Sequence, residues 1–167
     1  MGKEPNLDQS IICNLKRKAM KKVILSAALL VSIVAIASVS PSEVNEKVLK
    51  AFNETFSQAK DVVWHEYDTY FQANFRQDEI QVRAQYDESG ALLKTIRYYG
   101  EKQLLPNIVA KLKKRYSDRE IFGVTETTSP DEVTFLITLK DSKNWYVVKS
   151  DVYGNLEQTE KFKRADN

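Results

Sequence analysis

The chain of 167 residues carries an internal repeat, and this repeat limits the folds it can adopt more than any other feature. One apolar stripe at helical spacing is formed by Val48, Leu49, Phe52 and Phe56. An equivalent stripe, 60 positions later, contains Ile108, Val109, Leu112 and Tyr116. Because the two stripes match in spacing and in kind, we expect one helix in each half of the chain.

The ends of both helices carry sequence signals. The first helix is expected to start around Ser40-Pro41-Ser42-Glu43, because serine caps free backbone N–H groups and proline fits the first turn. It is expected to end near Gln58, and Leu105-Pro106 marks the start of the second helix. After each helix the apolar period changes from helical to alternating, which predicts about four antiparallel strands in each half.

The alternation assigns one face of the strands to a core beneath the helices. In the first half this set is Val62, Trp64, Phe71, Ala73, Phe75, Ile80, Val82, Ala84, Tyr86, Leu92, Ile96 and Tyr98. In the second half it is Phe122, Val124, Val133, Phe135, Ile137, Leu139, Tyr146, Val148, Leu156 and Phe162. Two such units, at about residues 41–100 and 101–164, can join edges. The predicted fold is α+β, a tandem repeat that forms one sheet of about eight strands with both helices on one face.

A second repeated feature is the D-x-x-G segment, which occurs as DESGALLKT from Asp87 and as DVYGNLEQT from Asp151. A calcium loop needs several oxygen ligands at alternating positions, and the second copy offers little beyond Asp151. A hairpin turn needs an aspartate that bonds the turn backbone and a glycine that accepts a positive φ. The repeated segment therefore predicts two structural turns rather than a cation site.

Residues 1–37 are expected to be an N-terminal extension and a secretory signal peptide, whose charged, apolar and small-residue order starts at Met20. Lys21 and Lys22 precede an apolar and small-residue run from Val23 to Ala37, which is shorter than the roughly 20 residues of a membrane-spanning helix. Cleavage is expected after Ala37, which leaves residues 38–167 as a periplasmic or secreted chain without a stable membrane anchor. Cys13 lies before the run rather than at its end, which argues against lipidation.

Removing that segment changes the charge and the cysteine content. It holds six of the 25 Lys and Arg and two of the 23 Asp and Glu, so residues 38–167 carry 19 basic and 21 acidic residues. A net charge of −2 does not favour nucleic acid as a partner. Residues 38–167 also lack cysteine, which excludes disulfides, thiol catalysis and cysteine-based metal sites in that part, and we expect no cofactor.

Several segments together resemble the β-lactamase-inhibitor-like, PepSY-like family of exported bacterial proteins. They are the first helix, DVVWHEYDTYFQANF, YDESGALLKT, LLPNIVAKLKKRYSD and DVYGNLEQT, and the resemblance covers about residues 43–163. It implies a tandem sheet with helices on one side in an exported protein, and it carries no catalytic residues. Secreted β-lactamase inhibitor proteins contain disulfides whereas residues 38–167 have no cysteine, so the resemblance concerns the fold rather than an inhibitory activity.

No residue set in the sequence points to a reaction. His65 is the only histidine, and in a strand it points away from the face shared by Glu66 and Asp68. A nucleophilic triad has no second histidine to use and no G-x-S-x-G turn. We therefore expect a protein that is not an enzyme.

The strand face that points away from the helices is the more informative surface. Its predicted residues are Tyr70, Gln72, Asn74, Arg76, Gln81, Arg83, Gln85, Arg97, Tyr99, Thr134, Leu136, Thr138, Trp145 and Val147. An uncovered antiparallel face should be polar, and the aromatic, aliphatic and arginine residues in this set have the composition of a protein interface. The candidate partner-binding residues are Trp145, Leu136, Arg97, Tyr99 and Arg83.

These patterns favour an exported, non-catalytic protein that binds an envelope or extracellular protein through that face, an inhibitor being one form of such a module. The alternative is a small-ligand or cation-binding protein of the cell envelope, which would use Asp87, Glu88 or the region of His65. A ligand that binds only the folded state raises the melting temperature, so titration with Ca²⁺ and Zn²⁺ separates the two hypotheses.

Overall fold

The structure is a computed structural model that describes residues 38–39 and 43–165. The chain divides into residues 1–35 and residues 36–167, and all described residues belong to the second unit. The predicted signal peptide, residues 1–37, lies outside the described residues. All further statements concern the second unit.

Its strands form one antiparallel sheet in which the spatial order follows the sequence order from β1 to β9. The first strands are β1 (Ser38–Val39), β2 (Lys60–Tyr67), β3 (Tyr70–Gln77), β4 (Ile80–Tyr86) and β5 (Leu92–Tyr99). The sheet continues with β6 (Glu120–Thr128), β7 (Val133–Lys140), β8 (Asn144–Ser150) and β9 (Leu156–Lys163). Apart from the two-residue β1, which pairs with β2, the sheet has the eight strands that the alternation predicts.

Helix α2 (Glu46–Thr55) and helix α3 (Pro106–Arg115) precede the two groups of four strands. Pro106 occupies the first turn of α3, as predicted. Helix α2 starts later than expected, because the Oδ1 atom of Asn45 caps it by accepting a hydrogen bond of 2.9 Å from the backbone N–H of Lys47. Ser40 and Pro41 lie outside the described residues. A short 3₁₀ turn, η2 (Glu101–Gln103), leads from β5 towards α3.

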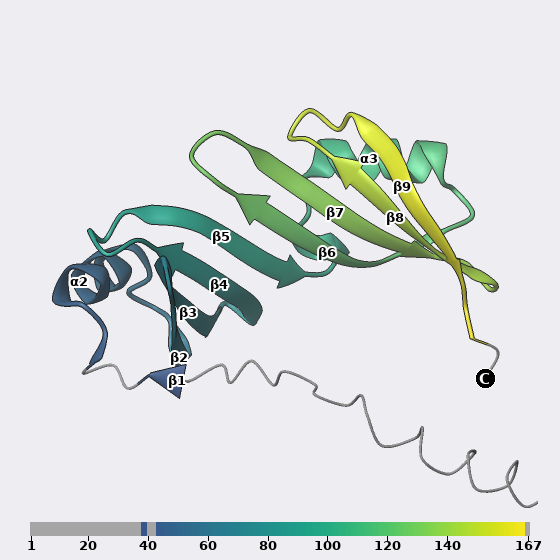
Figure 1. Ribbon diagram of the computed structural model, residues 1–167. Helices are drawn as coiled ribbons and strands as arrows, with labels where there is room; N and C mark the ends of the chain where they lie inside the picture. Colours follow the sequence, from purple (N-terminus) through teal and green to yellow (C-terminus); the bar gives the residue numbers. More distant parts are fainter. Residues whose placement is uncertain (1–37, 40–42, 166–167) are drawn as a thin grey trace, which may run out of the picture. The chain divides into compact units, whose positions relative to one another are not determined.

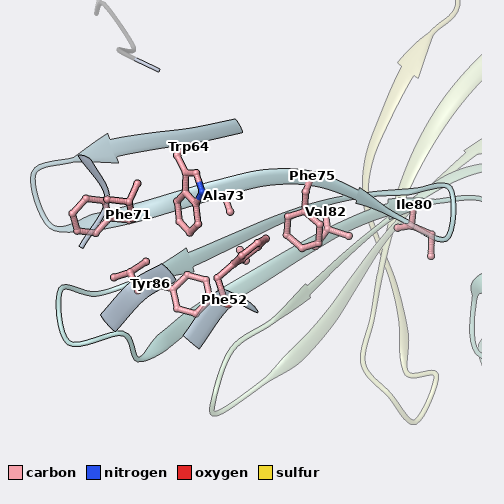
Figure 2. Packing of buried hydrophobic residues seen from close by; sticks show 11 residues of the cluster. Phe52, Trp64, Phe71, Ala73, Phe75, Ile80, Val82 and Tyr86 are labelled. Atoms are coloured by element: carbon pink, nitrogen blue, oxygen red, sulfur yellow. The ribbon is translucent and has the colours of Figure 1, made fainter. Parts of the chain in front are cut away.

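The first core lies between α2 and strands β2–β4 (Figure 1). Phe52 of α2 is at its centre, with ring centroids 5.1 Å from Trp64, 5.2 Å from Phe75 and 6.5 Å from Tyr86. Figure 2 shows these rings together with other members of the same buried cluster, Phe71, Ala73, Val82 and, further from the rings, Ile80. Edge-to-face ring pairs of this kind add about 0.5–1.5 kcal/mol beyond the burial of their area.

The second core lies between α3 and strands β6–β8 and is mostly aliphatic. Ile108 and Leu112 of α3 are buried against Ile137, Leu139 and Val148. Both helices lie on the same side of the sheet, because one row of directly paired residues connects the two cores: Phe75, Val82, Arg97, Glu126 and Phe135. The predicted α+β fold, one sheet with helices on one face, is confirmed.

Both D-x-x-G segments are hairpin turns that contact the preceding helix. Gly90 has a φ of +88° and Gly154 a φ of +77°, a region that other residues resist. The carboxylate of Asp87 accepts hydrogen bonds from the side chain of Ser89 and the backbone of Ala91, which lowers its pKa. The backbone N–H of Asn155 bonds Asp151 in the same way and lowers the pKa of that carboxyl group. The predicted structural turns are confirmed.

Three β-bulges overturn part of the predicted core. The extra residue of a bulge shifts the alternation of side chains, so residues beyond it change faces. Leu92 pairs with Tyr86 on the helix side, but Lys94 pairs with Gln85, which places Ile96 and Tyr98 on the opposite face. Similar irregularities at Ile121–Gly123 and between Val147 and Val148 shift the alternation in β6 and β9. As a result Phe122 and Phe162 are 58% and 52% exposed instead of buried. Leu92 keeps its predicted face but is 37% exposed there.

Candidate functional site

The face of the sheet opposite to α2 and α3 has no helix of the described part packed against it. We call it the open face. One row of paired residues crosses it from β2 to β9: Lys60, Arg76, Gln81, Tyr98, Thr125, Leu136, Lys149 and Glu157. The row shows that polar, aromatic and aliphatic side chains share this surface.

Three of the five predicted binding residues lie on the open face. Arg83 pairs with Ile96 between β4 and β5, Leu136 is 41% exposed on β7, and Trp145 lies on β8 opposite Phe162. Leu136 and Trp145 lie on neighbouring strands of the second half, with Trp145 paired to Lys140 further along β7, whereas Arg83 belongs to the first half.

Arg97 and Tyr99 lie on the helix side, so their predicted place on the open face is wrong. The bulge after Leu92 moves both residues to the other face, and Tyr99 packs against both hydrophobic cores. Arg97 donates a hydrogen bond of 3.1 Å to Glu126, and the hydroxyl group of Tyr99 donates to the same carboxylate. Burial, reinforced by the hydrogen bond to Glu126, raises the pKa of Tyr99. The three side chains form a polar connection between the cores.

Aromatic rings gather at one end of the open face, in what we call the aromatic cluster: Phe122, Trp145 and Phe162. The rings of Phe122 and Trp145 meet edge to face with centroids 4.8 Å apart. Lys140 and Arg164 lie over these rings, at 5.1 Å from the centroid of Phe122 and 5.4 Å from that of Trp145. The cluster leaves more than half of Phe122 and Phe162 in contact with solvent.

The open face of the first half is polar and contains a shallow cup of about 390 Å³. Asn74, Arg76, Arg83 and Tyr98 line it together with His65. The guanidinium of Arg83 stacks on the ring of Tyr98, 5.3 Å from its centroid. The cup and the aromatic cluster thus give the two halves of one face different chemistry.

Neighbouring amide side chains are ordered on the same surface. Gln85 donates a hydrogen bond of 2.9 Å to Gln72, and Gln72 donates one of 2.9 Å to Asn74. This chain of bonds holds three polar side chains in fixed positions beside the cup.

Asp87, the main residue of the cation-binding hypothesis, already has partners for its carboxylate within its own turn. Nowhere in the described part do three His, Cys, Asp or Glu side chains gather closely enough to hold a metal ion. Within residues 38–39 and 43–165, no helix is both long and apolar enough to cross a membrane.

The geometry therefore defines a class of protein: an α+β sheet with two helices on one face and an open, mixed polar and aromatic surface on the other. No family model and no curated protein matches the sequence. Solved structures of several Bacteroides proteins do match the fold. A BLIP-like protein from Bacteroides fragilis has a TM-score of 0.58 at 16% identity, over 74% of this chain and 89% of that one.

Two further structures give the same result. A DUF2874 family protein from Bacteroides ovatus matches with a TM-score of 0.58 at 17% identity, over 76% of this chain and 89% of that one. A candidate periplasmic protein from Bacteroides eggerthii matches with a TM-score of 0.55 at 14% identity, over 71% of this chain and 87% of that one. This chain has the fold of these proteins, as the resemblance of its sequence segments predicts.

Phe122, Phe162 and Tyr98 lie on the open face, although the alternation of buried neighbours in the sequence predicts all three in the core. Gly123, directly after Phe122, is the one local signal, since glycine inside a strand often marks a bulge.

Proposed function

We propose that this chain is an exported, non-catalytic binding protein that engages a protein partner through its open face. The observation that carries the proposal is the aromatic cluster, in which Phe122 and Phe162 are more than half exposed and Trp145 is partly exposed, on a sheet face that is otherwise mostly polar. Aromatic anchors beside arginine are typical of the centres of protein interfaces. The partner-binding residues of the proposal are Trp145, Leu136 and Arg83, joined by Phe122, Phe162 and Tyr98.

Exposure of the rings supports this function on energetic grounds. Full burial of a Phe-sized side chain stabilises a protein by about 1.5–3 kcal/mol, and roughly half of that is forgone where half of the ring meets water. Phe122 is 58% exposed and Phe162 is 52% exposed, and Leu136, 41% exposed, lies on the same face. A partner that covers these side chains would recover that contribution.

The fold neighbours support the export and the absence of catalysis in this proposal. One of them is described as a candidate periplasmic protein and another as BLIP-like, and neither description indicates a reaction. The predicted signal peptide agrees with a periplasmic or secreted location. Inhibition of the partner is one function that such binding would serve.

A site-specific photo-crosslink tests the proposal. A photoreactive amino acid replaces Thr138, which pairs with Val147 on the open face between Leu136 and the aromatic cluster. A matched protein carries the same group at Lys50 of α2, whose side chain is 78% exposed on the other side of the sheet. Irradiation in the producing cell is expected to join position 138, but not position 50, to one protein of the cell envelope or its surroundings.

Equal crosslinking from positions 138 and 50, or none from either, would contradict the proposal. Melting temperatures of both proteins are compared with that of the unmodified chain, so that a misfolded variant is not mistaken for an inactive surface.

A further inference from the structure

The charged residues of the open face are distributed unevenly between its two halves. In the first half, basic residues predominate: Lys60 on β2, Arg76 on β3, Arg83 on β4 and Lys94 on β5. Acidic residues of the second half lie on the same face, with Glu157 opposite Lys149 and Glu160 opposite Val147. Residues 38–167 have a net charge of −2, so the basic part is a local property of this surface.

The basic residues of the two halves also differ in their partners. In the second half, Lys140 lies 3.2 Å from Glu120 and Lys149 lies 3.8 Å from Glu132. In the first half, no Asp or Glu of the described residues lies within 4.0 Å of the charged groups of Arg76 or Arg83. The charge of these two arginines is therefore available to a binding partner.

Both arginines line the cup, where their guanidinium groups can meet carboxylates. Stacking on Tyr98 orients the guanidinium of Arg83, and a planar guanidinium offers paired N–H donors that match a carboxylate. Asn74 and Gln81 add amide groups to the same cup of about 390 Å³. Asp61 is the only Asp or Glu among the residues that line it.

We propose that the partner presents an acidic polypeptide segment to the cup and an apolar side chain to the aromatic cluster. This inference rests on the proposed function, since it names the chemistry of the partner for the same face. Arg83 and Trp145 are separated by four strand spacings and by six residues along the strands, which corresponds to roughly 25–30 Å. An extended segment of about eight or nine residues spans that distance.

A uniform polyanion fits this face less well than such a segment. Glu120, Glu157 and Glu160 would repel it in the second half, where the lysines already have acidic partners. The aromatic cluster would also be left without an apolar counterpart. A polypeptide can place carboxylates at one end and an apolar side chain at the other.

A synthetic peptide of twelve residues tests the inference on the purified chain. The peptide carries four Asp or Glu residues at one end and a Leu-Phe pair at the other, and a matched peptide carries Asn and Gln in place of the acids. Binding is followed by fluorescence anisotropy of the labelled peptide and by emission of Trp145, since Trp64 is only 2% exposed in the core. The acidic peptide is expected to bind at least about tenfold more tightly than its neutral match.

The matched protein variants separate the cup from the charge of the chain as a whole. Arg76→Gln with Arg83→Gln is expected to weaken binding of the acidic peptide by at least about tenfold. Lys47→Gln with Lys50→Gln changes the net charge by the same amount on α2 and is expected to change binding by less than about twofold. Equal losses from both pairs, or none from either, would overturn the inference.

Polyanions and the crosslink complete the test. If a heparin oligosaccharide or single-stranded DNA displaces the peptide at equal charge concentration, the cup binds negative charge without selecting a polypeptide. The inference of a polypeptide is then overturned. If the acidic peptide fails to bind while position 138 still captures a protein, the acidic partner is wrong and the proposed function stands. If the peptide does not bind and position 138 captures no protein, the acidic partner and the proposed function are both overturned.

Discussion

The two tryptophans of this protein lie on opposite faces of one sheet and have opposite surroundings. Trp64 of β2 is 2% exposed and packs edge to face against Phe52 of α2. Trp145 of β8 lies on the open face, where its ring contacts Phe122, a residue that is 58% exposed. Both residues belong to regular strands, so the presence of a covering helix, and not the strand itself, makes the difference.

This difference assigns separate roles to the two faces. Aromatic residues of the helix side are enclosed by a helix of the same chain and contribute to the free energy of unfolding (Figure 2). Those of the open face lack such a cover within the described residues and are available to another molecule. Substitutions on the helix side should therefore change stability, and substitutions on the open face should change binding.

The largest effect is expected from Phe52→Ala, which removes the central ring of the first core. Phe52 is 4% exposed and contacts the rings of Phe56, Trp64, Phe75 and Tyr86. Truncating a buried phenylalanine costs about 3–5 kcal/mol, because the surrounding side chains fill the cavity only in part. Urea unfolding measures the change, and a loss below about 1 kcal/mol would show that this core does not dominate stability.

A smaller, unequal pair of effects is expected at the two repeated turns. Both glycines have a positive φ, which costs an alanine about 1–2 kcal/mol. A Cβ atom at Gly90 would lie 2.8 Å from the backbone oxygen of Lys47, whereas one at Gly154 would lie 2.9 Å from the flexible side chain of Lys111. Gly90→Ala is therefore expected to destabilise more than Gly154→Ala in the same urea measurement. The reverse order would contradict this account of how the turns contact the helices.

High pH is expected to destabilise the protein through the buried tyrosines of the helix side. Burial raises the pKa of Tyr86 to about 12 and also raises that of Tyr99, whereas tyrosine in an unfolded chain ionises near pH 10. Above about pH 10 the unfolded state therefore loses protons first, and the free energy of unfolding decreases as pH rises through the folded pKa values. The free energy of unfolding of the Tyr99→Phe variant should decrease less steeply between pH 9 and 11 than that of the parent chain. Parallel curves for the two proteins would exclude this role of Tyr99.

The sequence predicts the architecture well because its signals are local and repeated. Each signal depends only on neighbouring residues: the helical stripes, the Leu105-Pro106 start and the two D-x-x-G turns. The repetition of the stripes and turns predicts two equivalent units. The start of α2 is less well predicted, because the capping residue is Asn45 rather than Ser40.

The candidate site is predicted only in part, because the face of the sheet on which a side chain lies depends on the bulges in its strand. A bulge depends on how two strands pair, and the alternation within a single strand does not reveal it. One bulge after Leu92 moves Arg97 and Tyr99 to the helix side, and two others bring Phe122 and Phe162 to the open face. Trp145, Leu136 and Arg83 are placed correctly because each lies in a stretch whose alternation agrees with its buried neighbours.

The most direct test of the separate roles of the two faces is the crosslinking yield from position 138 in Phe122→Ala with Trp145→Ala. The control is Tyr153→Ala, because Tyr153 is 75% exposed and lies in the turn after β8, away from the open face. The double variant is expected to keep its free energy of unfolding within about 1–2 kcal/mol of the parent chain and to lose at least about 90% of the yield. The control should keep both its free energy of unfolding and its crosslinking yield. An unchanged yield in a folded double variant would contradict the assignment of binding to the open face.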